Sequence, residues 1–176
     1  MHTKQDDDFL KLISENKGII IKICNSYCKN KNDREDVAQE IIYQLWKSNK
    51  SFNNDYKFST WMYRIALNVA ISFYRKGRSI QTTTVPLTTS HIDIEDTIFN
   101  SSDIEEKSAF LQKQISELQD LDKALILLYF EEKSYKEIAE IIGITETNVA
   151  TKVSRIKEKL KQNISKTKNN LWKTSN

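Results

Sequence analysis

Hydrophobic residues recur every three or four positions along most of this chain, which is the spacing of one face of an α-helix. The pattern predicts three helices in residues 6–78. The first starts at three consecutive aspartates, which are favourable at a helix N-terminus, and should break at Gly18. The second opens at the N-cap pair Asn32-Asp33, and the third covers residues 59–77.

Residues 107–176 show the same periodicity and predict a compact four-helix unit, with a helix-turn-helix at residues 135–154. Ala139 falls where the two helices of that motif cross and only a small side chain fits. Gly143 falls at the turn, where a positive φ costs a residue without Cβ little. The apolar residues expected between these helices are Ile138, Ile142, Ile144, Val149 and Val153. An αα-hairpin with no nucleic-acid role is the alternative.

The last helix is basic and two-sided. From Thr147 to Asn176 the chain carries eight Lys or Arg against one acid, Glu158. Its expected buried stripe is Val149, Val153, Ile156 and Leu160. The residues expected to face outward, toward DNA base edges, are Thr147, Ala150, Thr151, Ser154 and Arg155. The flanking lysines, suited to phosphate contacts, are Lys152, Lys157, Lys159 and Lys161. A charged run is often only a solvated face, but its continuity with a helix-turn-helix favours DNA binding.

The third helix of the first half carries a polar face as well as an apolar one. Projected at about 100° per residue, one narrow arc gathers three guanidiniums and one amide: Arg64, Asn68, Arg75 and Arg78. That arc suits a nucleic-acid backbone, and the amide can read one base because it offers a donor and an acceptor together. The expected core side is Phe58, Trp61, Met62, Ile65, Val69 and Phe73. A flanking stripe either packs on neighbouring helices or stacks on unpaired bases, and consists of Tyr63, Leu67, Ile71 and Tyr74.

Composition supports an all-α fold with two small helical domains joined by a flexible acidic linker. There are only three Gly and one Pro in 176 residues, and both residue types interrupt helices. Residues 1–78 carry a net charge of +5 and residues 107–176 a net charge of +4. Residues 79–106 have six acids, no Lys or Arg, frequent Ser and Thr, and no sustained helical stripe. This linker is either a plain tether or an imitation of nucleic acid lying in a basic channel.

Other candidate chemistry is sparse. Cys24 and Cys28 share one helix face, and two thiols are too few for a metal site, so reduced core cysteines are expected, with a thiol sensor as the alternative. No paired-carboxylate, Ser/His/Asp or phosphate-loop pattern is present, so we expect no catalytic residues, no metal and no cofactor. The chain lacks a signal-peptide pattern and a bilayer-length apolar run, which predicts a cytoplasmic protein without membrane insertion.

Three segments resemble the extracytoplasmic-function sigma factors of bacterial RNA polymerase. The family's polymerase-clamp-binding segment is similar to DREDVAQEIIYQLW. Its promoter-melting segment is similar to FSTWMYRIALNVAISFYRKGR, and its second DNA-binding segment is similar to SYKEIAEIIGITETNVATKVSRIKEKL. The resemblance covers roughly residues 10–78 and 108–162, and the three motifs stand in the family's order.

The resemblance implies roles for the matched residues. Residues 1–78 would bind core RNA polymerase, through Asp36, Gln39 and Glu40, and would melt the minus-ten promoter element. Asn68 matches the asparagine that captures a flipped minus-ten base, and the neighbouring phosphates would be held by Arg64, Arg75 and Arg78. Residues 107–176 would read duplex DNA at the minus-thirty-five element. An anti-sigma factor clamped on both domains is the expected regulator.

The chain departs from the family pattern in two places. Ala150 stands where many members carry a groove-reading arginine, and Thr145 stands where they often have proline. Readout of the minus-thirty-five element is therefore expected from DNA shape or from Thr147, Thr151, Lys152, Ser154 and Arg155.

Two other functions compete with that of a sigma factor. A stand-alone helix-turn-helix regulator would leave the DREDVAQE segment and the arginine-asparagine arc unused. An interaction or redox-switch module would rely on the two cysteines instead.

Overall fold

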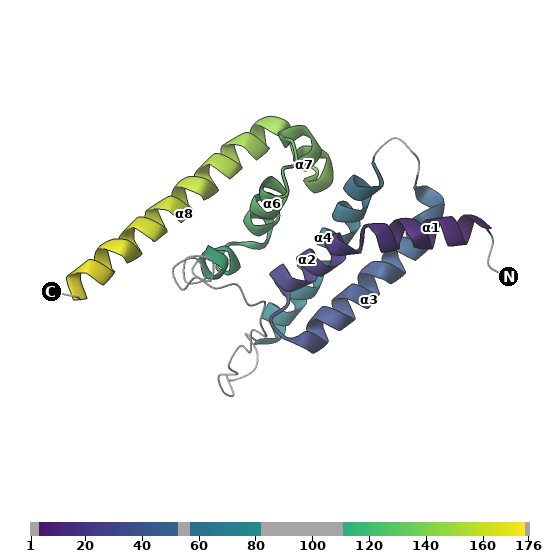
Figure 1. The fold of residues 1–176 in the computed structure, drawn as a ribbon, viewed down its shortest axis with the longest axis horizontal. Coiled ribbons are helices and arrows are strands. Elements are labelled where there is room, and N and C mark those ends of the chain that lie inside the picture. The colour runs from purple at the N-terminus through teal and green to yellow at the C-terminus, as the bar shows by residue number, and fades with distance from the viewer. Residues whose placement is uncertain (1–3, 53–56, 82–110, 175–176) are drawn as a thin grey trace. The chain divides into compact units, whose positions relative to one another are not determined.

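The computed structural model describes residues 4–52, 57–81 and 111–174, and every regular element in these ranges is helical (Figure 1). The chain divides into two units, Met1–Ile94 and Glu95–Asn176. The predicted all-α fold with two helical domains is confirmed. Most of the predicted linker falls in residues 82–110, which lie outside the described residues.

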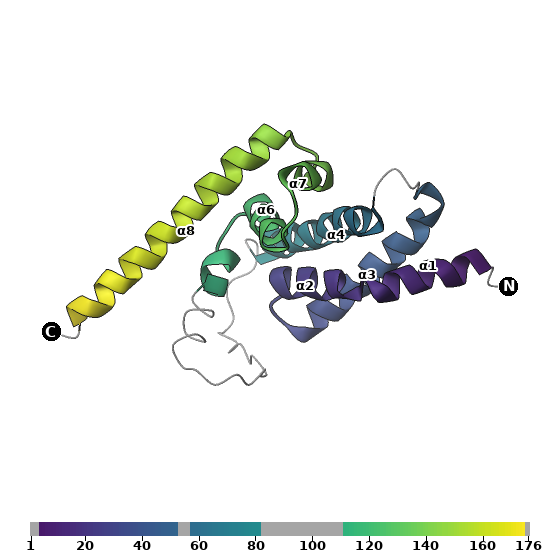
Figure 2. The same cartoon turned by 45° about the horizontal axis from the view of Figure 1, so that its top comes forward.

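Four α-helices form the first unit. They are α1 (Lys4–Glu15), α2 (Lys17–Tyr27), α3 (Lys31–Ser48) and α4 (Phe58–Gln81), with a short 3₁₀ helix, η1 (Asn49–Ser51), after α3. Helix α4 packs against α2 and α3, and α2 also packs against α3 (Figure 2). The side chains that α2 and α3 bury include Ile20, Ile23, Val37, Ile41 and Leu45.

Three helix boundaries differ clearly from the sequence prediction. Helix α4 ends at Gln81 rather than at residue 77. The break expected at Gly18 lies at Asn16, where the side-chain Nδ2 donates to the Leu12 carbonyl over 2.9 Å. Helix α3 starts before the predicted N-cap pair, because Asn30 is the residue that caps it. The Asn30 Oδ1 accepts a hydrogen bond from the Asp33 backbone N–H over 2.8 Å, which satisfies one of the free donors of the first turn.

The buried face of α4 also differs from the prediction. Its buried residues are Thr60, Met62, Tyr63, Ala66, Leu67 and Ala70. The larger apolar residues expected in the core are half-buried or exposed, and they are Phe58, Trp61, Ile65, Val69 and Phe73. The prediction is confirmed for Met62 and wrong for the other five, because two alanines occupy the centre of the buried face, where small side chains allow α2 and α3 to approach closely.

Trp61, one of the half-buried residues of α4, has a packing role of its own. The Trp61 ring lies 5.1 Å from Phe52, 5.6 Å from Phe58 and 6.1 Å from Phe9, measured between ring centroids. Such tilted and edge-to-face contacts add to the stability that burial gives. The assignment of Trp61 mainly to structure is therefore confirmed.

The second unit contains helical turns at residues 111–116, followed by α6 (Asp120–Phe130), α7 (Tyr135–Ile142) and α8 (Glu146–Thr174). Helices α6 and α7 pack against each other and against α8 (Figure 2). The predicted α8 stripe is confirmed as buried: Val149, Val153, Ile156 and Leu160. In α7 the buried residues are Ile138 and Ile141, whereas Ile142 and Ile144 are only half-buried.

The ends of α7 are fixed by local chemistry. At its start the Ser134 hydroxyl accepts from the Glu137 backbone N–H, and the Glu137 carboxylate accepts from the Ser134 N–H, which is a capping box. At its end Gly143 adopts φ +81°, and its N–H donates to the Ala139 carbonyl over 2.8 Å. The glycine expected at the turn is therefore confirmed in the left-handed conformation.

Replacing Gly143 by alanine should lower the free energy of unfolding of the second unit by about 1–2 kcal/mol, because Cβ disfavours the left-handed conformation. The matched change is Gly18→Ala, which should stabilise the first unit by roughly 0.5–1 kcal/mol since Gly18 is helical. A Cβ meets nothing within 4 Å at either glycine, so the two changes differ in backbone conformation alone. Denaturant unfolding followed by circular dichroism measures both, and destabilisation of similar size at the two sites would contradict the interpretation.

Candidate nucleic-acid interface

The polar arc of α4 lies on the solvent side of the first unit. Arg64, Asn68 and Arg75 are all exposed, and they lie opposite the buried face that contains Ala66 and Ala70. The side chain of Arg78 lies outside the described residues. We call Arg64, Asn68 and Arg75 the α4 ridge. Its three side chains can reach a ligand without rearrangement of the core, as nucleic-acid contacts require.

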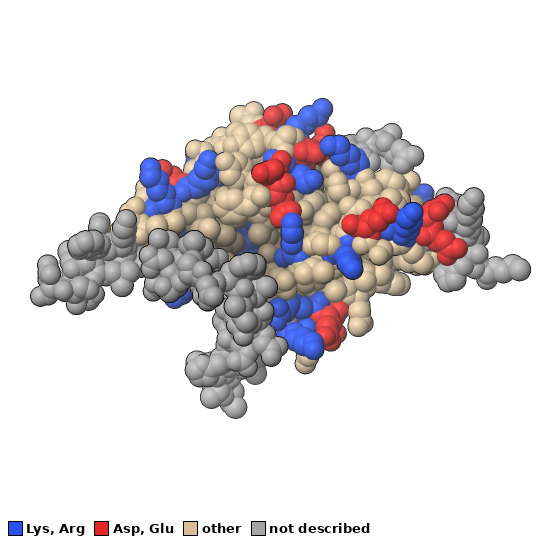
Figure 3. Space-filling model, in the orientation of Figure 1, with Lys and Arg blue, Asp and Glu red and all other residues tan. Residues whose placement is uncertain are grey.

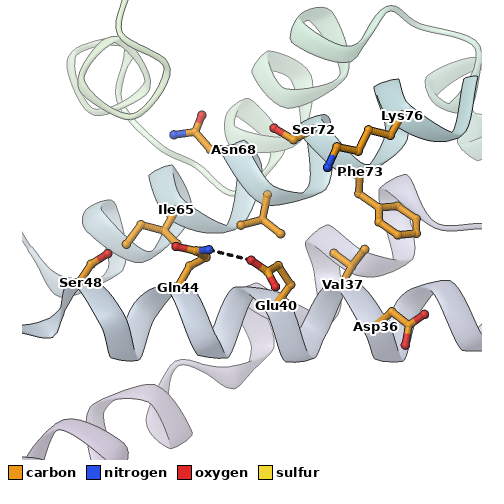
Figure 4. Close-up of a pocket in the computed structure, with 11 residues that line it drawn as sticks. Asp36, Val37, Glu40, Gln44, Ser48, Ile65, Asn68, Ser72, Phe73 and Lys76 are labelled. Carbon is orange, nitrogen blue, oxygen red and sulfur yellow. Dashed lines mark hydrogen bonds between the residues drawn. The ribbon is translucent and has the colours of Figure 1, made fainter. Parts of the chain in front are cut away.

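A groove of about 700 Å³ runs between α3 and α4 beside this ridge (Figure 4). Asp36 and Glu40 line it from α3, and Asn68, Ser72 and Lys76 line it from α4. The apolar part of its lining is Val37, Ile65, Val69 and Phe73. The structure thus brings two residues predicted to bind polymerase and the residue predicted to read a base to one groove.

A hydrogen bond orients one wall of this groove. The Gln44 Nε2 donates to the Glu40 Oε1 over 2.7 Å, one helical turn along α3 (Figure 4). Because Gln44 also lines the groove, the Glu40 carboxylate is held toward α4. Gln39 is exposed but does not line the groove, so the predicted polymerase-binding residues cover two adjoining faces of α3.

The exposed side of α3 carries apolar side chains that the sequence analysis missed. Ile42, Tyr43 and Trp46 are 42%, 55% and 39% exposed. The Trp46 ring lies at the edge of the core, 6.3 Å from the ring of Phe9. The sequence did contain a signal for this surface. Ile42 and Trp46 are four residues apart and therefore lie on one face of α3, and they fall outside the repeat of its buried residues. Exposed aromatic side chains beside polar ones are typical of a protein-binding surface.

Helix α8 presents most of its predicted DNA-facing residues to solvent. Thr147, Thr151, Ser154 and Arg155 are exposed, whereas Lys152 is half-buried on the flank. The Thr151 hydroxyl donates to the Thr147 carbonyl over 3.0 Å. Its proton is therefore occupied within the helix, and Thr151 offers a partner an acceptor and a methyl group.

Thr145 has a local role at the start of α8. Its Oγ1 accepts a hydrogen bond from the Asn148 backbone N–H over 3.3 Å. A threonine in this position caps the helix, which a proline could not do through its side chain. The departure from the family pattern is thus compatible with a stable turn.

Charge on the described surface is mixed. In Figure 3 the Lys and Arg side chains alternate with Asp and Glu on the face drawn. Ion pairs such as Lys11–Glu15 and Lys31–Glu35 are exposed, with N···O distances of 4.0 and 3.9 Å, and contribute little to stability. The face drawn therefore shows no single large basic surface.

Cys24 and Cys28 are free and buried, with 3% and 6% of their surface exposed. Burial raises the pKa of both thiols. The pKa of Cys28 rises to about 12, with further raising by Cys24 and Asp33 and a smaller opposing effect of Arg34. A neutral, buried thiol is a poor nucleophile. In the described part of the chain no three metal-binding side chains of the His, Cys, Asp and Glu types cluster together.

We expect the native thiols to resist iodoacetamide at pH 8 and to react fully once guanidinium unfolds the chain. Because the folded state favours the neutral thiol of Cys28, this contribution to stability is complete below the ordinary thiol pKa of 9.0 and is lost as pH rises toward 12. Mass spectrometry of the alkylated protein measures the extent of reaction. Rapid native labelling at pH 8 would contradict the assignment and favour a thiol sensor.

A helix-turn-helix with a basic second helix, in a chain whose other helical unit exposes an arginine-asparagine ridge, is typical of a DNA-binding protein. The profile for Sigma-70 region 2 matches residues 12–80, and that for Sigma-70 region 4 matches residues 111–160. The chain belongs to the extracytoplasmic-function (ECF) family of RNA polymerase sigma factors, and the predicted resemblance is confirmed.

Similar proteins cover most of the chain. The ECF RNA polymerase sigma factor SigW of Bacillus subtilis is 30% identical over 90% of this chain and 89% of its own length. RNA polymerase sigma factor SigV of the same organism is 31% identical over 81% and 82%. The sigma factor RpoE from Bartonella quintana, solved in complex with the anti-sigma factor NepR, superposes with a TM-score of 0.71. It is 21% identical, over 90% of this chain and 97% of that one, and so shows the fold alone.

None of the helices in the described ranges combines the length and the hydropathy that crossing a lipid bilayer requires.

Proposed function

We propose that this sigma factor works through three surfaces. Helix α3 binds core RNA polymerase, the α4 ridge binds one strand of the opened minus-ten element, and α8 binds the duplex minus-thirty-five element. The observation that carries the proposal is the exposed α4 ridge beside the groove that also contains Asp36 and Glu40. A stand-alone duplex-binding regulator has no use for that pairing of features.

Promoter melting needs contacts that exist only after the strands separate. Unstacking and flipping a base costs a few kcal/mol. The Asn68 amide can pair with a flipped base, while Arg64, Arg75 and Arg78 neutralise the phosphates beside it. Because these contacts favour the opened strand over the duplex, they offset the unstacking cost and nucleate melting.

Polymerase binding is assigned to α3. Asp36 and Glu40 offer carboxylates to a basic partner, and Gln39 offers an amide on the neighbouring face. The exposed side chains of Ile42, Tyr43 and Trp46 would add apolar area that is buried only in the complex.

Readout of the minus-thirty-five element is assigned to the N-terminal turns of α8. Thr147, Thr151, Ser154 and Arg155 lie exposed there, and Lys152 reaches a phosphate from the flank. With Ala150 in place of an arginine, shape-dependent recognition contributes more of the specificity.

Regulation by an anti-sigma factor is proposed by analogy with the sigma factor RpoE from Bartonella quintana, which was solved in complex with the anti-sigma factor NepR. A partner that covers α3 or the α4 ridge would block polymerase or promoter. The protein is proposed to act in the bacterial cytoplasm, where polymerase and promoters are, without catalytic chemistry, metal or cofactor of its own.

Run-off transcription with purified core polymerase tests this function. The full chain plus core should produce transcripts that start at defined sites on genomic templates, and core alone should not. Absence of any promoter-specific transcript, together with tight duplex binding by the free chain that core polymerase does not change, would favour the stand-alone regulator.

A further inference from the structure

Tyr129 on α6 and Lys157 on α8 form a contact that links two helices near the DNA-facing side of the second unit. The Lys157 Nζ donates a hydrogen bond to the Tyr129 hydroxyl over 3.0 Å. The same Nζ lies 4.8 Å from the centroid of the Tyr129 ring, within the range of a cation–π contact. These contacts hold the ammonium of Lys157 in one place. The lysine is nevertheless exposed to solvent.

The position of Lys157 along α8 matches the edge of the DNA groove. It follows Ser154 by three residues and therefore lies on the same side of the helix. It is six residues beyond Thr151, which corresponds to about 9 Å along the axis at 1.5 Å per residue. The major groove is about 8.5 Å deep, which is close to this distance along α8. When the N-terminal turns of a recognition helix contact the bases, Lys157 would therefore lie at the height of the DNA phosphates.

We propose that Lys157 and Tyr129 form a preset binding site for one DNA backbone phosphate at the minus-thirty-five element, with Tyr129 as the positioning residue. This inference rests on the proposed promoter-binding function. Lysine has three N–H donors, of which the tyrosine hydroxyl takes one. The hydroxyl that accepts this bond keeps its own O–H, so two lysine donors and one tyrosine donor remain for the same phosphate.

The surroundings of the pair favour this use over a purely structural one. The hydrogen bond to Tyr129 raises the pKa of Lys157, so the ammonium stays charged at any physiological pH. The Tyr129 ring is itself held by Tyr135 and Phe130, at centroid distances of 6.4 and 6.0 Å. A free lysine would lose rotamer freedom on meeting a phosphate, whereas this one has already lost part of it.

The test measures the salt dependence of promoter binding by the holoenzyme, on a promoter recovered by mapping the sites that the holoenzyme occupies. Lys157→Gln should reduce the slope of log affinity against log salt by about one unit, because one phosphate contact is lost. Tyr129→Phe should weaken binding several-fold. When Tyr129→Phe is combined with Lys157→Gln, it should weaken binding little further, because both side chains contact the same phosphate.

Lys159→Gln is the matched control, since Lys159 is exposed on the opposite flank of α8. The loss of binding free energy caused by Lys159→Gln should add fully to the loss caused by Tyr129→Phe. Two results would contradict the phosphate site when the wild-type holoenzyme binds: an unchanged salt slope in Lys157→Gln, or additive effects of Tyr129→Phe and Lys157→Gln on the binding free energy. In either case the pair only stabilises the packing of α6 against α8. If the wild-type holoenzyme selects no promoter, the proposed function itself fails.

Discussion

Replacing Asn68 by alanine should slow promoter opening by the holoenzyme about 10- to 100-fold, since a lost base contact is worth roughly 1–3 kcal/mol. Promoter occupancy should persist in part, because the contacts proposed for α3 with polymerase and for α8 with duplex DNA are unchanged. Asn68 is exposed on α4, so the change removes no core packing and should leave the free energy of unfolding within about 0.5 kcal/mol of the wild type.

Genome-wide mapping measures occupancy in this experiment, and permanganate reactivity of unpaired thymines measures opening. Asn25→Ala is the matched control, because Asn25 is an exposed asparagine on α2, outside the three proposed surfaces. Equal opening by the Asn68 variant and the wild type would remove this residue from its proposed role.

Reversing the charge of Asp36 should have the second large effect, on assembly with polymerase rather than on melting. Asp36→Lys should weaken binding to core polymerase about 100-fold or more, since disrupting an interfacial charge pair costs about 2–5 kcal/mol. Asp36 is exposed, and folding should be unaffected. Fluorescence titration of labelled protein with core polymerase measures the dissociation constant.

Asp8→Lys provides the comparison for Asp36→Lys, because Asp8 is an exposed aspartate on α1 and the change in net charge is the same. It should bind core polymerase within about threefold of the wild type, since isolated surface charges act weakly in salt. Equal loss in both variants would mean that net charge, not the α3 surface, controls assembly.

Much of the fold could be predicted because helix periodicity is a local property. The α8 stripe of Val149, Val153, Ile156 and Leu160 is regular enough to identify the buried side without knowledge of its partner helices. Gly143 was identifiable because a left-handed residue after a short helix strongly prefers glycine.

Other features depend on tertiary contacts that the sequence does not reveal. The buried face of α4 is set by Ala66 and Ala70, whose small size matters only because α2 and α3 approach there. The sequence pattern predicted that α3 opens at Asn32-Asp33, and only the backbone geometry shows that Asn30 caps it. The Tyr129–Lys157 contact joins residues 28 positions apart, beyond any local pattern.

The exposure of the candidate residues on α4 could be predicted from the sequence, but the groove beside them could not. Spacing along one helix placed Arg64, Asn68 and Arg75 on one face, and all three are exposed. The groove that brings Asp36 and Glu40 beside Asn68 requires the packing of α3 against α4. That arrangement suggests that polymerase binding and strand capture occur on neighbouring surfaces of one small unit.

Site-specific crosslinking tests most directly whether the α4 ridge binds one DNA strand after the promoter opens. A photoreactive benzoylphenylalanine at Ser72, an exposed groove residue one turn from Asn68, would be placed in the holoenzyme on a mapped promoter. We predict crosslinks to a single strand within the opened minus-ten region, and their loss in closed complexes held on ice. Equal crosslinking of both strands before opening, or no crosslink in open complexes, would contradict the account.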